Sequence, residues 1–192
     1  MKDTYRVRVG GLLGIGGAVT WFIAVLVQQG LALQTSGTPG YAALQALFAL
    51  AFLGILGSIL GLRWSGAAGA SRFATIATGI YVTGMVGFVL AAATSAVTAS
   101  DDIPIAPFAA LITNIGALLT GIAVLRARHW GSWQRFTPLL VFLYSFFGFS
   151  LPAIITGQEP SVFALFVFGI PWLFQGLAVY TRAQALRAPA PA

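Results

Sequence analysis

Long apolar runs separated by short polar segments dominate this chain and set its predicted architecture. A helix rises about 1.5 Å per residue, so crossing a hydrocarbon core about 30 Å thick takes roughly 20 apolar residues. Six stretches approach or exceed that length, and none contains Asp, Glu, Lys, Arg or His. The two-residue alternation of a membrane barrel is missing. The pattern therefore predicts an all-α, polytopic integral membrane protein, a bundle of six transmembrane helices at Val9–Gln29, Tyr41–Leu62, Phe73–Thr98, Ile103–Leu125, Phe136–Thr156 and Ser161–Tyr180.

Composition excludes a water-soluble fold. Of the 192 residues, 58% are hydrophobic and 7% charged, whereas soluble domains carry about 25% charged residues. The absence of cysteine excludes disulfides, thiolate metal sites and iron–sulfur clusters. Because the connections between spans are short, we expect a single six-helix domain over residues 1–187, followed by a disordered tail at 188–192.

The charged residues predict the orientation of the bundle. All ten Lys and Arg residues fall on one side of the six spans, whereas Asp101, Asp102 and Glu159 fall on the other. Cytoplasmic loops are enriched in Lys and Arg, so we expect both termini in the cytoplasm and a multi-pass protein of the cell (plasma or inner) membrane. The net charge of +6 is then explained by topology and anionic headgroups, without a nucleic-acid partner.

Small residues at spacings of three and four predict close helix packing. In membranes, helices associate through such seams and through interhelical hydrogen bonds. The first four spans carry seams, so we expect them to form a tight group with a bulkier aromatic hairpin beside it. We also expect Asp101 and Asp102 to cap the fourth helix. The seams are Gly10, Gly14 and Gly17; Ala51, Gly54, Ser58 and Gly61; Gly84, Gly87, Ala91, Thr94 and Thr98; and Ala106, Ala109, Thr113, Gly116, Thr120 and Ala123.

The last two spans are rich in aromatic residues. One interpretation is a surface for a flat or long apolar ligand (a lipid, quinone or carotenoid), with Phe146, Phe149, Phe166 and Trp172 as candidates. The alternative is ordinary core or lipid-facing packing. No other cofactor and no metal site is indicated.

The residues needed for most membrane chemistry are missing from the spans. Ionisable side chains at membrane depth mark proton relays and ion paths, and the six spans contain none. His129 is the single histidine and lies in a predicted loop, which excludes bis-histidine haem ligation within one chain. The serines of the spans have no histidine or lysine at their depth to act as a base. An enzyme is therefore disfavoured, and no catalytic residue is proposed.

Uncharged polar residues fall at similar depth near mid-membrane. Asn114 is the most costly of them to leave unpaired, because its amide has donors and acceptors to satisfy. Either Asn114 fixes helix packing, or the whole layer lines a cavity for a neutral solute, as midplane sites do in transporters. The candidate ligand-binding residues are Thr20, Tyr81, Thr83, Thr113, Asn114, Tyr144 and Ser145.

Two functional hypotheses follow. The first is a non-catalytic membrane subunit or interaction protein that packs against other membrane chains, a second copy of itself, or apolar cofactors and lipids. The second is a transporter-like protein that binds a small neutral or apolar solute at the mid-membrane layer.

The second hypothesis is accompanied by a likeness of architecture. Six spans in under 200 residues, with both ends cytoplasmic and a small-residue pair at Gly10 and Gly14, resemble the substrate-binding subunits of energy-coupling-factor vitamin transporters. In that family a small-residue stripe docks the partner subunits. No substrate-binding motif of the family is present to carry over, so the resemblance covers architecture alone.

Overall fold

The structure is a computed structural model that describes residues 2–31, 33–157 and 161–186. Every regular element in the described residues is helical. Six helical stretches are long and apolar enough to cross a membrane, as the hydrophobic pattern predicts. The predicted tail at 188–192 and Glu159 lie outside the described residues.

Four of the spans are single helices at their predicted places: α1 (Lys2–Gly30), α2 (Pro39–Trp64), α3 (Arg72–Thr98) and α4 (Ile105–Ala127). The last span, α7 (Val162–Ala185), continues through Pro171. The fifth is different, because it is built from pieces instead of one α-helix. A 3₁₀ turn, η1 (Ser132–Phe136), leads into α5 (Thr137–Leu143), a π-helical segment, η2 (Tyr144–Ser150), and α6 (Leu151–Thr156).

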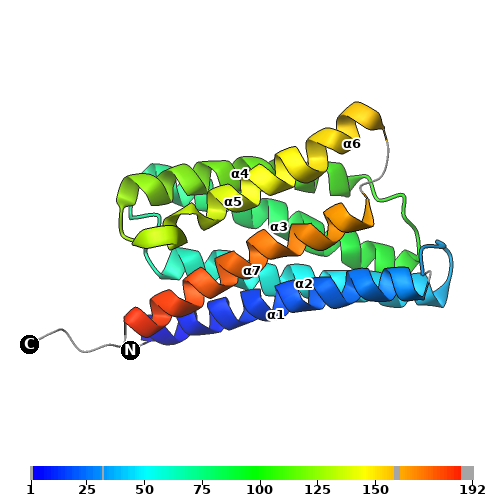
Figure 1. Ribbon diagram of the computed structural model, residues 1–192, viewed down its shortest axis with the longest axis horizontal. Coiled ribbons are helices and arrows are strands. Elements are labelled where there is room, and N and C mark those ends of the chain that lie inside the picture. The colour runs from blue at the N-terminus through cyan, green and yellow to red at the C-terminus, as the bar shows by residue number, and fades with distance from the viewer. Residues whose placement is uncertain (1, 32, 158–160, 187–192) are drawn as a thin grey trace, which may run out of the picture.

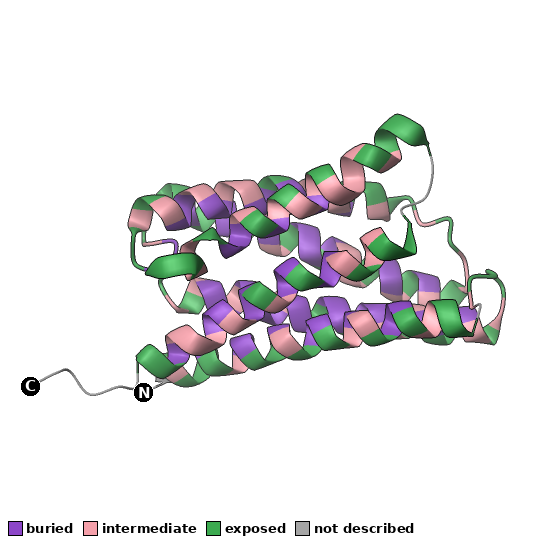
Figure 2. Cartoon of the chain, viewed as in Figure 1, coloured by how far each residue is buried: buried purple, intermediate pink, exposed green. Residues whose placement is uncertain are grey.

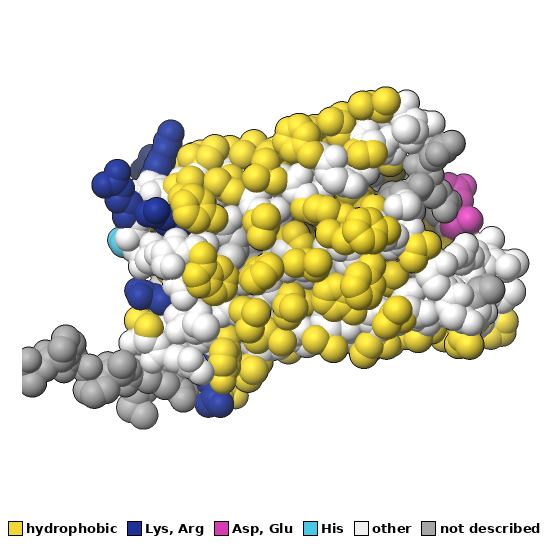
Figure 3. All heavy atoms as spheres, in the orientation of Figure 1, with side chains coloured by type: hydrophobic (Ala, Val, Ile, Leu, Met, Phe, Trp, Pro, Cys, Tyr) yellow, Lys and Arg dark blue, Asp and Glu magenta, His cyan; other side chains and the backbone are white. Residues whose placement is uncertain are grey.

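The helices form an elongated bundle in which α1 packs against both α2 and α7, α2 packs against α3, and α3 packs against α4 (Figure 1). The space-filling view has a broad apolar band around the middle, with basic side chains at one end and acidic side chains at the other (Figure 3). We call these the basic end and the acidic end. This separation matches the segregation of charge along the sequence.

Glycines let the α1 and α2 backbones touch, as the small-residue seams predict. A Cβ added to Gly17 would lie 2.6 Å from the Ala51 carbonyl oxygen, and one added to Gly54 would lie 2.6 Å from the Gly17 Cα. The α3–α4 seam is equally close, since a Cβ on Gly84 would lie 2.4 Å from the Thr113 nitrogen. Both seams are confirmed at these glycines, whereas Thr94 and Thr98 of the predicted stripe on α3 are exposed.

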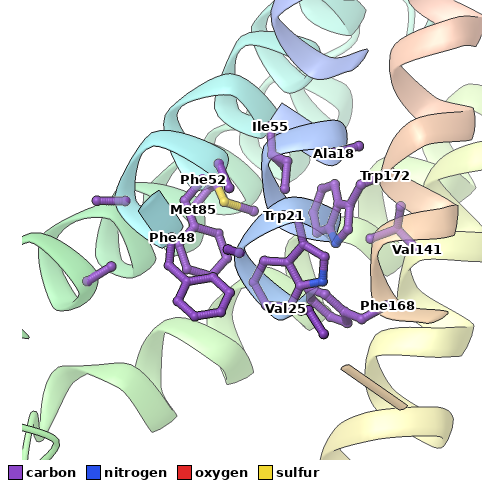
Figure 4. Packing of buried hydrophobic residues seen from close by; sticks show 14 of the residues in the cluster. Ala18, Trp21, Val25, Phe48, Phe52, Ile55, Met85, Val141, Phe168 and Trp172 are labelled. Carbon is purple, nitrogen blue, oxygen red and sulfur yellow. The ribbon is translucent and has the colours of Figure 1, made fainter. Parts of the chain in front are cut away.

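The expected grouping of the helices is wrong for α7. This helix packs along α1, where a Cβ on Gly176 would lie 2.7 Å from the Ile15 nitrogen. Its Phe168 and Trp172 join the main hydrophobic core, with Trp21 of α1 in contact with both Phe168 and the rings of α2 (Figure 4). The aromatic residues of the last span therefore belong to the core as much as to the surface.

The least buried part of the bundle is the arm formed by α5, η2 and α6, which we call the α5–α6 arm. Exposure increases along it toward the acidic end, as the burial colours show (Figure 2). Phe147 is 54% exposed, and Ile154 and Ile155 are 73% and 74% exposed. Large apolar side chains at such exposure are stable only against lipid or another apolar surface.

Capping at the acidic end also differs from the prediction. Thr38 caps α2 through its side chain, which accepts a hydrogen bond from the Tyr41 N–H. The N-cap of α4 is Pro104, which makes no side-chain cap hydrogen bond. Asp101 and Asp102 thus do not cap α4, because the helix begins at Ile105, too far along the chain for their carboxylates to hold the N3 position. Their carboxylates are exposed instead.

Candidate functional site

The seven predicted mid-membrane polar residues do not converge. Thr20 donates a hydrogen bond to the Gly16 carbonyl of its own helix and borders a groove on the outer surface between α1 and α2. Thr83 is exposed on the outer face of α3. Similar depth in the membrane did not bring these side chains together, because they lie on different faces of the bundle.

Three of the seven residues lie at the contact between α4 and its neighbours. The Asn114 amide donates to the Ser150 hydroxyl at 3.3 Å, and Ser150 donates to the Ser145 carbonyl inside the π-helical segment. Thr113 packs against Gly84. Two oxygens here, Asn114 Oδ1 and Thr113 Oγ1, are buried without a partner in the described residues. Asn114 therefore joins α4 to the irregular fifth span.

Tyr81 and Tyr144 make separate contacts with α7. The Tyr144 hydroxyl donates to the Ala164 carbonyl at 2.9 Å. The Tyr81 hydroxyl donates to the Gln175 Oε1 at 3.2 Å, and the Gln175 amide donates to the Ser58 hydroxyl at 3.0 Å. Ser58 donates in turn to the Ile55 carbonyl.

Tyr81, Gln175 and Ser58 therefore form a continuous chain of hydrogen bonds across α3, α7 and α2, which we call the central chain. All three side chains are fully buried. Gln175 was not among the residues predicted from the sequence, although a lone amide inside an apolar span is a signal that could have identified it. Every polar side chain in the central chain has a partner, so it functions as an interhelical lock.

The four predicted aromatic ligand-surface residues are dispersed. Trp172 is buried in the core and packs near Tyr81. Phe149 packs on Phe168 and Phe166 packs on Phe22. Phe146 stacks on Phe142 within the α5–α6 arm. These residues do not form one continuous surface.

A pocket of about 200 Å³ lies at the acidic end between α2, α3 and the segment that leads into α4. We call it the acidic-end pocket. Its polar lining comes from Tyr41 and Gln45 on α2, Ser95 on α3, and Asp101 in the connection after α3, whereas Phe52 and Phe88 lie deeper. Phe88 is ten residues before the end of α3, which corresponds to roughly 15 Å of helix.

Local structure positions these groups. The Thr38 cap and Pro39 start α2 so that Tyr41 lies in its first turn. At the end of α3, Ala99 adopts a left-handed conformation (φ 51°), and its carbonyl accepts a hydrogen bond from the Gly37 N–H in the α1–α2 connection. This bond ties the two connections together at the rim of the pocket. Ala91, Ala92 and Ala106 are too small to fill the space between the three helices.

The hydroxyls in the pocket are hydrogen bonded in a definite direction. Ser95 donates to the Ser100 carbonyl, which can only accept. A hydroxyl has one proton, so in the 3.2 Å contact between Tyr41 and Ser95 the tyrosine is the donor. Both hydroxyl protons are thus used within the protein. What the pair still offers to a ligand is lone pairs.

No charged partner neutralises the pocket. Residues 33–62 and 73–125, which supply all of its lining, contain Asp101 and Asp102 but no Lys, Arg or His. His129 lies at the basic end, where it is exposed and its Nδ1 hydrogen bonds with the Gly66 carbonyl. This pocket was not predicted from the sequence, because residues of α2, α3, α4 and the α3–α4 connection form it jointly and no motif marks it.

Comparisons with known proteins give no family for this chain: no protein-family model, curated protein or solved structure matches it.

Proposed function

We propose that this protein is a non-catalytic membrane protein that binds a small solute in the acidic-end pocket. The observation that supports this most is the pocket itself, about 200 Å³ in volume, with Tyr41, Gln45, Ser95 and Asp101 in its lining. Ligand sites typically combine apolar walls with a few converging polar groups. The proposal moves the solute site from the mid-membrane layer to the acidic end.

The other polar groups of the bundle fit a structural role better. The central chain is fully buried and its side chains bond to one another. A ligand there would have to displace hydrogen bonds that already join three helices. In the acidic-end pocket, by contrast, space and unused acceptors are present together.

Filling the pocket tests this function. Ala92 is 6% exposed and lines the pocket, so Ala92→Phe places a ring in space that is empty. We expect wild-type protein in mild detergent to be stabilised by at least one compound from a panel of small hydrophilic solutes. Ligand at 100 times its Kd contributes about 2.7 kcal/mol, which corresponds to roughly 5–11 °C in Tm for a chain of this size. Ala92→Phe should remove that shift.

Val97→Phe is the matched control, because Val97 is on the same helix and 87% exposed. This variant should keep the full ligand-dependent shift. The proposal fails if no compound stabilises the wild type, or if Ala92→Phe responds as the wild type does.

The orientation of the bundle is part of the proposal. The basic end is assigned to the cytoplasm by the preference of cytoplasmic loops for Lys and Arg. The acidic-end pocket then opens toward the outside of a plasma or inner membrane. A solute would reach it from the extracellular or periplasmic side.

A second candidate function is a subunit that docks another membrane chain on the α5–α6 arm. The exposure of Phe147, Ile154 and Ile155 favours it.

A partner chain should then co-purify with this protein in a fixed ratio in mild detergent, and the double variant Phe147→Ala with Ile154→Ala should release that partner. Leu26→Ala on α1, where Leu26 is 61% exposed, should not. Recovery of the chain alone from its native membrane would contradict this candidate. A lipid, quinone or carotenoid on the arm stays a prediction.

A further inference from the structure

The polar groups of the acidic-end pocket are mostly hydrogen-bond acceptors, and the one charge in its described lining is negative. This restricts the class of solute that the pocket can bind. Asp101 lies in the lining, and an ionised carboxylate offers hydrogen-bond acceptors only. No Lys, Arg or His occurs in residues 33–62 and 73–125, the two stretches that supply the lining of the pocket. Among the described residues, Asp101 has no ion-pair partner. A ligand that supplies positive charge would give it one.

The Tyr41 and Ser95 hydroxyls also favour a ligand that donates hydrogen bonds. Ser95 uses its proton on the Ser100 carbonyl, and Tyr41 uses its proton on Ser95. The pair can therefore accept hydrogen bonds from a ligand but has no proton left to donate. Gln45 adds a further carbonyl oxygen, together with the one N–H₂ group among these polar side chains. Acceptors outnumber donors, so a ligand rich in N–H groups fits and an anion does not.

The inner end of the pocket is aromatic. Phe52 and Phe88 stack with ring centroids 4.9 Å apart and an angle of 15° between their planes. Aromatic rings favour cations over anions near their faces and accept the apolar part of a ligand. The volume of about 200 Å³ is below the roughly 300–1,000 Å³ of pockets for drug-sized ligands, so the pocket suits a small ligand.

We propose that the acidic-end pocket is selective for small organic cations, protonated amines with a short apolar portion, and that Asp101 at the pocket mouth supplies the selectivity. This inference rests on the proposed solute-binding function and names its substrate class. The ammonium group pairs with Asp101 and donates to the Tyr41 and Ser95 oxygens, while the apolar portion lies toward Phe52 and Phe88.

Charge selectivity can be measured without knowing the natural ligand. The chain has no cysteine, so a single Ala92→Cys variant places one thiol in the pocket lining. The probes are aminoethyl methanethiosulfonate, which is cationic, and sulfonatoethyl methanethiosulfonate, which is anionic. Neutral methyl methanethiosulfonate normalises for thiol reactivity. We expect the cationic reagent to modify purified Ala92→Cys protein on the order of tenfold faster than the anionic one.

Asp101→Asn in the Ala92→Cys background should bring the two rates to within about twofold of each other, because the charge at the mouth is gone. Asp102→Asn is the matched control. It removes the same charge from the neighbouring residue, which is not part of the lining, so it should reduce the preference much less than Asp101→Asn does. A Val97→Cys variant reports the field at this end of the bundle outside the pocket, and its preference should be small.

Protection of Ala92→Cys from the neutral reagent by an added compound is a second test of charge selectivity on the same protein. tert-Butylammonium, a protonated amine with three N–H donors, should slow the modification of Ala92→Cys by the neutral reagent, whereas tert-butanol, which is similar in shape but uncharged, should not. Equal protection by both compounds would contradict the inference.

The possible results distinguish a failure of cation selectivity from a failure of solute binding in the acidic-end pocket. If Ala92→Cys reacts with none of the reagents, water does not reach the pocket and the proposed function fails with the inference. If it reacts with cationic and anionic reagents equally, or if the preference survives Asp101→Asn, only the cation selectivity is overturned. Equal effects of Asp101→Asn and Asp102→Asn would likewise assign the preference to the acidic end as a whole and overturn the role of Asp101.

Discussion

Replacing Gly17 with leucine is expected to prevent the bundle from folding into a stable form, whereas the same change at the adjacent Gly16 is expected to be tolerated. A Cβ on Gly17 would lie 2.6 Å from both the Ala51 oxygen and the Ile55 nitrogen, which are backbone atoms of α2. Backbone cannot turn aside as a side chain can. The two helices would have to separate, at an expected cost of more than about 3 kcal/mol.

Gly16→Leu is a matched control for Gly17→Leu, because the two glycines are adjacent on α1. Nothing lies within 4 Å of a Cβ added there, so leucine at this position projects into open space at the surface. Both substitutions raise helix propensity and hydrophobicity equally. Size-exclusion profiles and Tm in mild detergent measure the outcome. A Gly17→Leu protein as monodisperse and as heat-stable as Gly16→Leu would show that the α1–α2 seam is not as close as described.

Replacing Gln175 with methionine is expected to destabilise the protein by about 1–3 kcal/mol, because it leaves the Tyr81 hydroxyl buried without its acceptor. Methionine is similar in size, so the effect should come from the lost hydrogen bonds and not from a cavity. Tyr81→Phe in the same protein should recover part of the loss, since it removes the unpartnered hydroxyl. We expect a coupling energy of about 0.6–1.7 kcal/mol, the range of interhelical hydrogen bonds in membranes.

Thr83→Val is the control for this double-mutant cycle of Gln175→Met and Tyr81→Phe. Thr83 is two residues from Tyr81 on α3 but faces outward. Its combination with Gln175→Met should be additive within about 0.3–0.5 kcal/mol. Reversible unfolding in mixed detergent, or Tm where unfolding is irreversible, gives the free energies. If the effects of Gln175→Met and Tyr81→Phe on the free energy of unfolding are additive, the central chain does not hold the helices together as proposed.

The candidate site was much harder to predict than the spans. Asn114 was recognised as a polar residue needing a partner, but its partner, Ser150, lies 36 residues away in a π-helical segment that periodicity did not reveal. Asp101 and Asp102 were interpreted as caps because they precede a helix with prolines near its start. The position of that start, at Ile105, decided against capping and left Asp101 in the lining of the pocket.

The sequence by itself determined the number of long apolar helices, the separation of charge between the two ends, and the glycine seams of α1 with α2 and of α3 with α4. These follow from local composition, because a run of apolar residues must form a helix in lipid, where water cannot satisfy the backbone. The seams follow from spacing along one helix. Neither property requires knowledge of what lies on the other side of a helix.

Only the tertiary structure decided which faces meet. Tyr81 points inward and Thr83 outward, although both are polar and two residues apart. Gln175 joins Tyr81 and Ser58 because α7 packs against partners far away in the sequence. The acidic-end pocket is lined jointly by residues of α2, α3, the α3–α4 connection and α4, with alanines among them. In a chain so uniformly apolar, hydrophobicity distinguishes the faces of a helix only weakly. Their assignment therefore comes from the fit of backbones and the pairing of a few polar groups.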